Sequence, residues 1–170
     1  GLPVKNVIED YNSYDLLNSK KKEKIMNEFI SLGTDIIIGN PPYQDDAVGE
    51  QKTYNGPIYN HYLDCAYIIS DVVEMIHPAR FLSNAGSTPK AWNKKMLEDK
   101  HLMIASFHQN AKELFDDLQL TGGIVVTYRD NKKKFSPINV FMPYSELESI
   151  CNKVTSFRNF KSMSDIVVSR

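Results

Sequence analysis

The most constraining feature of the sequence is a short apolar run that two prolines terminate. Three consecutive isoleucines lie between Asp35 and Gly39, and the tetrapeptide Asn-Pro-Pro-Tyr follows at residues 40–43. β-Branched residues in a row, without polar alternation, are typical of a strand whose two faces are both covered. Proline has no backbone N–H to donate, so neither a strand nor a helix continues past Pro41. The run therefore predicts a central strand that ends in a rigid turn.

The rest of the chain alternates between helical and extended patterns. Ile25, Phe29 and Leu32 recur at helical spacing and predict a helix over residues 20–32. Such alternation is typical of an α/β fold with a mainly parallel sheet, and the missing crossover helix between the last two strands predicts an antiparallel final strand. The other predicted helices cover residues 58–69, 89–99 and 145–154, and the other predicted strands cover residues 4–8, 71–76, 101–107 and 122–128.

Composition excludes several classes of protein. The 170 residues carry 20 basic and 21 acidic side chains, so no basic excess supports DNA binding by the chain alone. No apolar run reaches the ~18 residues that a membrane helix needs, and no signal-peptide pattern is present. The two cysteines, Cys65 and Cys151, form no C-x-x-C pair, which argues against structural zinc or a disulfide framework. We therefore expect a cytoplasmic protein without a metal.

Residues 35–43 resemble the catalytic motif of amino-group methyltransferases that use S-adenosylmethionine, above all the adenine-N6 DNA methyltransferases. The resemblance implies that Asn40, Pro41, Pro42 and Tyr43 form the catalytic site and that S-adenosylmethionine is the methyl donor. The string Ile-Ile-Gly-Asn-Pro-Pro-Tyr-Gln is most similar to the methylase segment of the large type IIG restriction-modification enzymes.

The chemistry of adenine methylation accounts for these residue types. The exocyclic N6 of adenine is planar and a poor nucleophile, because its lone pair is delocalised into the ring. Two acceptors on its N–H groups, the Asn40 side-chain oxygen and the Pro41 carbonyl, would favour a pyramidal nitrogen aimed at the methyl group. The prolines hold both acceptors stiffly, as an in-line transfer requires. Tyr43 offers a ring on which the extruded base stacks.

The same resemblance implies roles for three further residues. Asp15 and Leu16 match an Asp-Leu pair that contacts the adenine of the cofactor in this family. Phe115, in a short segment before the last strand, matches a phenylalanine that packs on the extruded base. The residues themselves leave alternatives open, because Asp15 also suits a helix cap and Phe115 also suits a buried core.

The resemblance covers about residues 4–130 and departs from the family at its start. A strand and a Gly-rich turn open the cofactor-binding half of such enzymes, and no such unit precedes Asp15. We therefore expect a partial Rossmann-like methyltransferase fold, with residues 1–130 as the catalytic half and its first strands missing. Residues 131–170 are expected to form an appendage or the start of another domain. The implied partners are DNA and the missing cofactor-binding and target-recognition segments.

The predicted function is that of a catalytic-half segment of a site-specific adenine-N6 DNA methyltransferase from a restriction-modification system, inactive alone. A glutamine-N5 protein methyltransferase applies the same tetrapeptide to a planar amide. The polar loop over residues 44–56 and the Phe115 segment favour a base as substrate. A non-catalytic assembly or binding module that needs a second chain is the remaining alternative.

Overall fold

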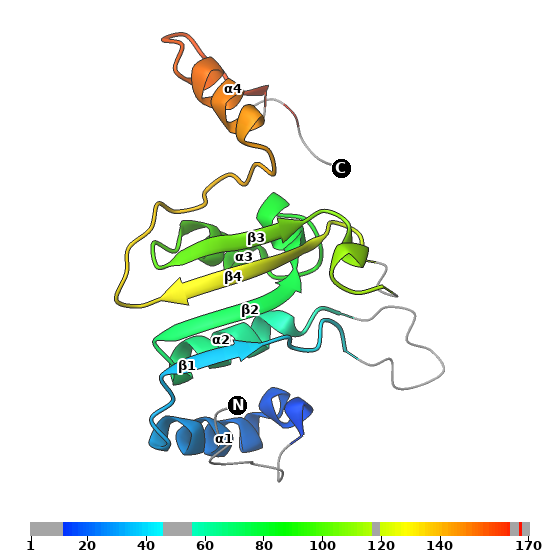
Figure 1. The fold of residues 1–170 in the computed structure, drawn as a ribbon, viewed down its shortest axis with the longest axis vertical. Coiled ribbons are helices and arrows are strands. Elements are labelled where there is room, and N and C mark those ends of the chain that lie inside the picture. The colour runs from blue at the N-terminus through cyan, green and yellow to red at the C-terminus, as the bar shows by residue number, and fades with distance from the viewer. Residues whose placement is uncertain (1–11, 46–55, 117–119, 164–166, 168–170) are drawn as a thin grey trace. The chain divides into compact units, whose positions relative to one another are not determined.

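The computed structural model describes residues 12–45, 56–116, 120–163 and 167. The strand predicted over residues 4–8 and most of the loop predicted over residues 44–56 lie outside these ranges. The chain divides into two compact units, residues 1–139 and residues 140–170. The first unit is an α/β fold built on a four-stranded sheet, which confirms the predicted fold class (Figure 1).

Each strand and each α-helix in the described residues begins and ends within a few residues of its predicted position, whereas the short 3-10 helices were not predicted. The strands are β1 (Ile36–Gly39), β2 (Val72–Pro78), β3 (Leu102–His108) and β4 (Ile124–Asp130). The helices of the first unit are α1 (Ser19–Ser31), α2 (Tyr59–Ile69) and α3 (Lys90–Glu98), and the second unit contains α4 (Ser145–Thr155). Short 3-10 helices occur at η1 (Ser13–Leu17), η2 (Ala79–Ser83) and η3 (Ala111–Glu113).

The sheet has the strand order β1-β2-β4-β3. β1 pairs with β2 in parallel, whereas β4 runs antiparallel to both β2 and β3. Three strands therefore run in one direction and the last strand in sequence, β4, lies between two of them in the opposite direction. This arrangement confirms the predicted antiparallel final strand in a mostly parallel sheet.

β1 lies at the edge of this sheet, so its predicted central position is wrong for the described residues. Ile36 is 58% exposed and Ile38 is 77% exposed. Among the residues that the structure describes, β1 pairs with β2 only, which makes it an edge strand. Ile36 and Ile38 point to the same face of β1, and the described residues leave that face largely uncovered. An apolar run indicates that a strand prefers to be buried, but it does not indicate which other segment would bury the strand.

The core lies between the sheet and the helices α2 and α3, around an aromatic cluster. Tyr59 of α2 stacks on His77 of β2 at 5.4 Å between ring centroids, and Trp92 of α3 meets Tyr59 edge-on at 5.9 Å. His77 is fully buried, with Nδ1 3.2 Å from the Pro78 carbonyl and Nε2 2.9 Å from the Thr127 hydroxyl. Burial lowers the pKa of His77 to about 4. The cluster anchors the end of β2.

Backbone hydrogen bonds continue beyond β4. The amides of Asn131 and Phe135 donate to the carbonyls of Asp71 and Lys100, at 3.0 Å and 2.6 Å.

In the second unit, α4 exposes Leu147, Ile150 and Val154 on its surface. None of the described helices is both long enough and apolar enough to cross a membrane.

Candidate active site

The tetrapeptide at residues 40–43 is held at both of its ends. It leaves the sheet directly after Gly39, the last residue of β1. At its other end, the Ile58 amide donates to the Tyr43 carbonyl at 3.1 Å, and Gln44 forms an antiparallel bridge with Pro57. The strand and the segment entering α2 therefore fix a turn that the two prolines already stiffen.

The side chains of this turn differ in exposure. Asn40 is exposed, whereas Pro41, Pro42 and Tyr43 are half-buried. The Tyr43 hydroxyl is buried and has no hydrogen bond of normal length to any described residue. Burial raises the pKa of Tyr43, and the nearby Asn40 side chain lowers it by less. The Tyr43 hydroxyl is therefore protonated and the side chain uncharged at neutral pH.

One cavity brings the turn together with Phe115. It has a volume of about 930 Å³. Phe115 follows η3, its amide donating to the Ala111 carbonyl at 3.0 Å, and its half-buried ring reaches this cavity. The cavity therefore joins residues that lie more than 70 positions apart in the sequence. Its lining consists of Ser13, Asn40, Pro41, Pro42, Tyr43, Phe115 and Asp116.

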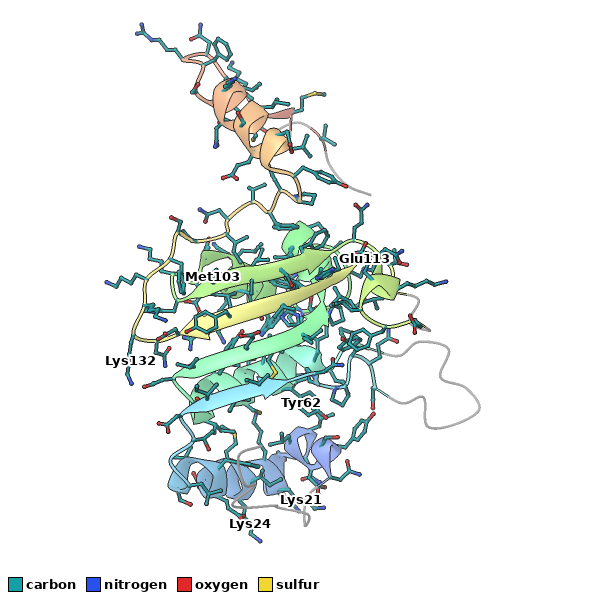
Figure 2. All side chains as sticks on the ribbon, viewed as in Figure 1. Lys21, Lys24, Tyr62, Met103, Glu113 and Lys132 are labelled. Atoms are coloured by element: carbon teal, nitrogen blue, oxygen red, sulfur yellow. The ribbon has the colours of Figure 1, made fainter. Side chains whose placement is uncertain are left out.

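A second cavity, of about 780 Å³, lies at the free edge of β1. It shares Ser13, Asn40, Pro41 and Pro42 with the first cavity and is otherwise lined largely by apolar side chains from η1, α1, β1 and α2. Leu16 is among them, and so is Tyr62, which lies between β1 and α1 (Figure 2). The Asn-Pro-Pro turn therefore borders both cavities, and the Asn40 amide is available to a molecule in either one.

The structure places Asp15 differently from its neighbour Leu16. The Asp15 carboxylate accepts from Lys21 Nζ at 2.7 Å and from the Asn12 amide at 3.2 Å, in a capping box at the start of η1. The hydrogen bond from Lys21, which Figure 2 labels on α1, holds the pKa of Asp15 below its usual range. Asp15 does not line the β1-edge cavity. The helix α1 itself is capped by Asn18.

S-Adenosylmethionine combines an adenine ring, a ribose and a charged methionine moiety, and the β1-edge cavity fits part of it. The apolar lining, Leu16 and Pro41 included, suits the adenine ring. The buried Tyr62 hydroxyl has no hydrogen bond of normal length in the described residues and could bind a polar group of a ligand. Among the described residues, no carboxylate lines the cavity to bind the ribose hydroxyls.

Two lining residues of the Phe115 cavity were not predicted from the sequence. Ser13 lies two positions before Asp15, and Asp116 directly follows Phe115. Their only signal in the sequence is this proximity to predicted site residues. The described residues contain no group of three or more His, Cys, Asp or Glu side chains arranged to bind a metal.

Comparison with known families assigns this arrangement to a class of enzyme. Residues 3–115, about two-thirds of the chain, match the family described as Eco57I restriction-modification methylase. The matched region includes η1, β1, the tetrapeptide and the segment up to Phe115. The fold and the family together define a methyltransferase of the restriction-modification type. The chain belongs to the Eco57I restriction-modification methylase family. No curated protein and no solved structure matches it.

Proposed function

We propose that this chain is the catalytic half of a site-specific adenine-N6 DNA methyltransferase of the type IIG restriction-modification class. In this proposal, a methyl group passes from S-adenosylmethionine to the N6 of an adenine extruded from DNA. One observation carries the proposal: Asn40, Pro41 and Pro42 border two cavities at once. A methyl transfer needs such a junction, because donor and acceptor must approach from opposite sides of the reacting carbon.

The Phe115 cavity would hold the target adenine. Tyr43 and Phe115 supply two aromatic faces for stacking, and Asn40 and the Pro41 carbonyl supply two acceptors for the N6 amino group. When both N–H groups are bound, the lone pair of N6 turns away from the ring and toward the methyl donor. Since Asn40 is exposed, the proton that N6 loses after transfer has a path to solvent. No general base with a perturbed pKa is required.

The β1-edge cavity would hold part of the methyl donor. Leu16 and Pro41 would contact its adenine ring, and the Tyr62 hydroxyl, from the same lining, would bind one of its polar groups. S-Adenosylmethionine supplies an electrophilic methyl group on a positively charged sulfur. In this proposal Asp15 contacts the methyl donor only if its ion pair with Lys21 opens. The carboxylates that bind the ribose hydroxyls would therefore come from a cofactor-binding half outside the described residues. A DNA substrate places the activity in the cytoplasm.

Product analysis tests the proposal. The complete methylase, this chain together with its cofactor-binding half, is incubated with isotopically labelled S-adenosylmethionine and either DNA or a protein substrate, and each substrate is then digested to nucleosides or amino acids. We expect label in N6-methyldeoxyadenosine. Label in methylglutamine of a protein substrate would instead support the protein methyltransferase. Methylation of neither substrate would leave the chain as an assembly module and contradict the proposal.

A further inference from the structure

Tyr43 also lines a cavity that the proposed reaction does not use. This cavity has a volume of about 380 Å³, and Tyr43 is the one described residue that it shares with the Phe115 cavity. Its lining comes from the ends of several elements. Arg80 of η2 contributes the one charged side chain among the described lining residues, and Ser87, Thr88 and Thr121 contribute hydroxyls.

The side chain of Arg80 is held between two glycines from separate loops. Gly86 and Gly122 have φ angles of +84° and +97°. A Cβ placed on Gly122 would lie 2.6 Å from Arg80 Cγ, and one placed on Gly86 would lie 3.3 Å from Arg80 Cβ. Both positions therefore lack a side chain where the arginine stem passes. The close approach restricts the stem, so less conformational entropy is lost when its guanidinium binds a ligand.

The charge of Arg80 is not matched within the described part of the chain. Arg129, by contrast, forms an ion pair with Asp99 at 2.8 Å and lies over the Tyr67 ring at 4.7 Å. Arg80 forms no ion pair with any described residue, and no carboxylate among these residues lines its cavity. A cavity whose described lining offers one guanidinium and no carboxylate is suited to an anion.

The hydroxyls in the lining are not equivalent. The buried Thr88 hydroxyl donates to the Asn93 side-chain oxygen at 2.7 Å, so its proton is not available to a ligand. Ser87 and Thr121 are exposed and form no such bond in the described residues. An anion at Arg80 would therefore find two further hydroxyl donors. Phosphate oxygens accept from a guanidinium in bidentate geometry, which distinguishes arginine from lysine at such sites.

We propose that the Arg80 cavity binds a backbone phosphodiester of the DNA strand that carries the target base. This inference rests on the proposed function, because Tyr43 is the wall common to this cavity and to the cavity for the extruded adenine. A base stacked on one side of Tyr43 brings the phosphates attached to its own sugar within reach of the adjoining cavity. Arg80 then positions the target nucleotide and takes no part in the methyl transfer itself.

Salt-dependent DNA binding tests the assignment of Arg80. The complete methylase is compared with its R80Q and K94Q variants, and the dissociation constant for the DNA duplex is measured at several salt concentrations. Lys94 is the matched control, since it is a 73% exposed cation on α3 whose nearest carboxylate is at 3.9 Å. We expect R80Q to weaken binding roughly tenfold or more at low salt and to reduce the salt slope by about 0.9. K94Q should change neither quantity.

Chemical modification of the DNA identifies the phosphate. Single neutral methylphosphonates are placed at each position around the target adenine. One position should weaken binding of the unmodified enzyme and leave binding of R80Q unchanged, because the two changes remove the same contact. The opposite result would be that millimolar inorganic phosphate occupies the cavity fully in competition with DNA, while no methylphosphonate weakens DNA binding. The ligand would then be a free anion, and the inference would be overturned.

The two proposals fail in distinguishable ways. If the enzyme methylates adenine while R80Q binds DNA with unchanged affinity and salt slope, Arg80 has no phosphate contact and the proposed function stands. If the unmodified enzyme neither binds nor methylates DNA, the proposed function fails and this inference fails with it. Fluorescence of Trp92, which is 6% exposed, reports whether R80Q is folded. An R80K variant that restores the salt slope but only part of the affinity would support bidentate binding.

Discussion

Replacing Gly123 with alanine should destabilise the fold more than an alanine at either of two other glycines. Gly123 precedes β4 and has a φ of +80°. A Cβ at this position would lie 2.4 Å from the carbonyl oxygen of His108 and 3.0 Å from the Cα of Gln109. These atoms belong to the backbone at the end of β3, so the contact cannot be relieved by rotating a side chain. The ends of β3 and β4 would have to separate.

The expected loss of stability in Gly123→Ala follows from a comparison with two other glycines. Gly56 has no atom within 4 Å of the position that a Cβ would take, so its replacement should be neutral or stabilise by up to about 1 kcal/mol. Gly33 also has free space but a φ of +65°, so alanine should cost about 1–2 kcal/mol. At Gly123 a similar backbone strain is joined by overpacking, typically about another 1–3 kcal/mol. The expected total for Gly123→Ala is about 2–5 kcal/mol.

Urea unfolding measures all three variants with one probe. Trp92 is the only tryptophan of the chain, and its buried ring packs against Tyr59 and Phe81. Its fluorescence should therefore follow unfolding of the first unit. We predict that Gly56→Ala is the most stable variant, Gly33→Ala is intermediate and Gly123→Ala is the least stable. Equal losses for the Gly33 and Gly123 variants would refute the reasoning, because the backbone contact at His108 would then contribute nothing.

Two further predictions concern Tyr43 and His77. Tyr43→Phe removes a buried hydroxyl that has no hydrogen-bond partner of normal length among the described residues, so kcat/KM should change only a few-fold. Tyr43→Ala should lose about 1–3 kcal/mol of stacking, and equal damage from both changes would indicate a proton donor. Burial lowers the pKa of His77 from 6.5 to about 4. Between these two values the histidine is protonated in the unfolded chain and neutral in the folded chain, so the stability of the fold should fall as the pH decreases from 6.5 to 4. His77→Gln should flatten this decline in urea unfolding measured across that range, and an unchanged slope would contradict the assignment.

The succession of helices and strands could be predicted because its signals are local. Ile25 lies on the buried side of α1, and Gly33, with its positive φ, follows the end of that helix. The edge position of β1 could not be predicted, because it depends on which segments pair with the strand. The three isoleucines indicate a preference for burial on both faces, but they do not report the position of the strand in the sheet, and the described residues place β1 at the edge with Ile36 and Ile38 exposed on one face.

The same distinction applies to the site: some of its residues can be predicted from local sequence signals, and others depend on contacts between distant segments. Residues 40–43 form a contiguous motif, so the sequence identifies them without knowledge of the fold. The cavity that joins them to Phe115 requires the β3–β4 pairing, and periodicity alone does not reveal it. Arg80 carries no sequence signal at all. Its setting depends on Gly86 and Gly122, whose backbones approach its side chain only in the folded chain.

Methylation of DNA by an Asn40→Ala variant tests the central claim most directly. Asn40 is exposed and follows β1, so its truncation should leave urea unfolding nearly unchanged. If its side-chain oxygen binds the N6 amino group in the transition state, the rate of N6-methyladenine formation by the complete methylase should fall on the order of 10²–10³-fold. We expect the Asn40→Ala enzyme to show this loss of rate and still to bind the DNA duplex. A folded Asn40→Ala enzyme that kept more than about a tenth of the unmodified rate would contradict the role of the tetrapeptide in methyl transfer.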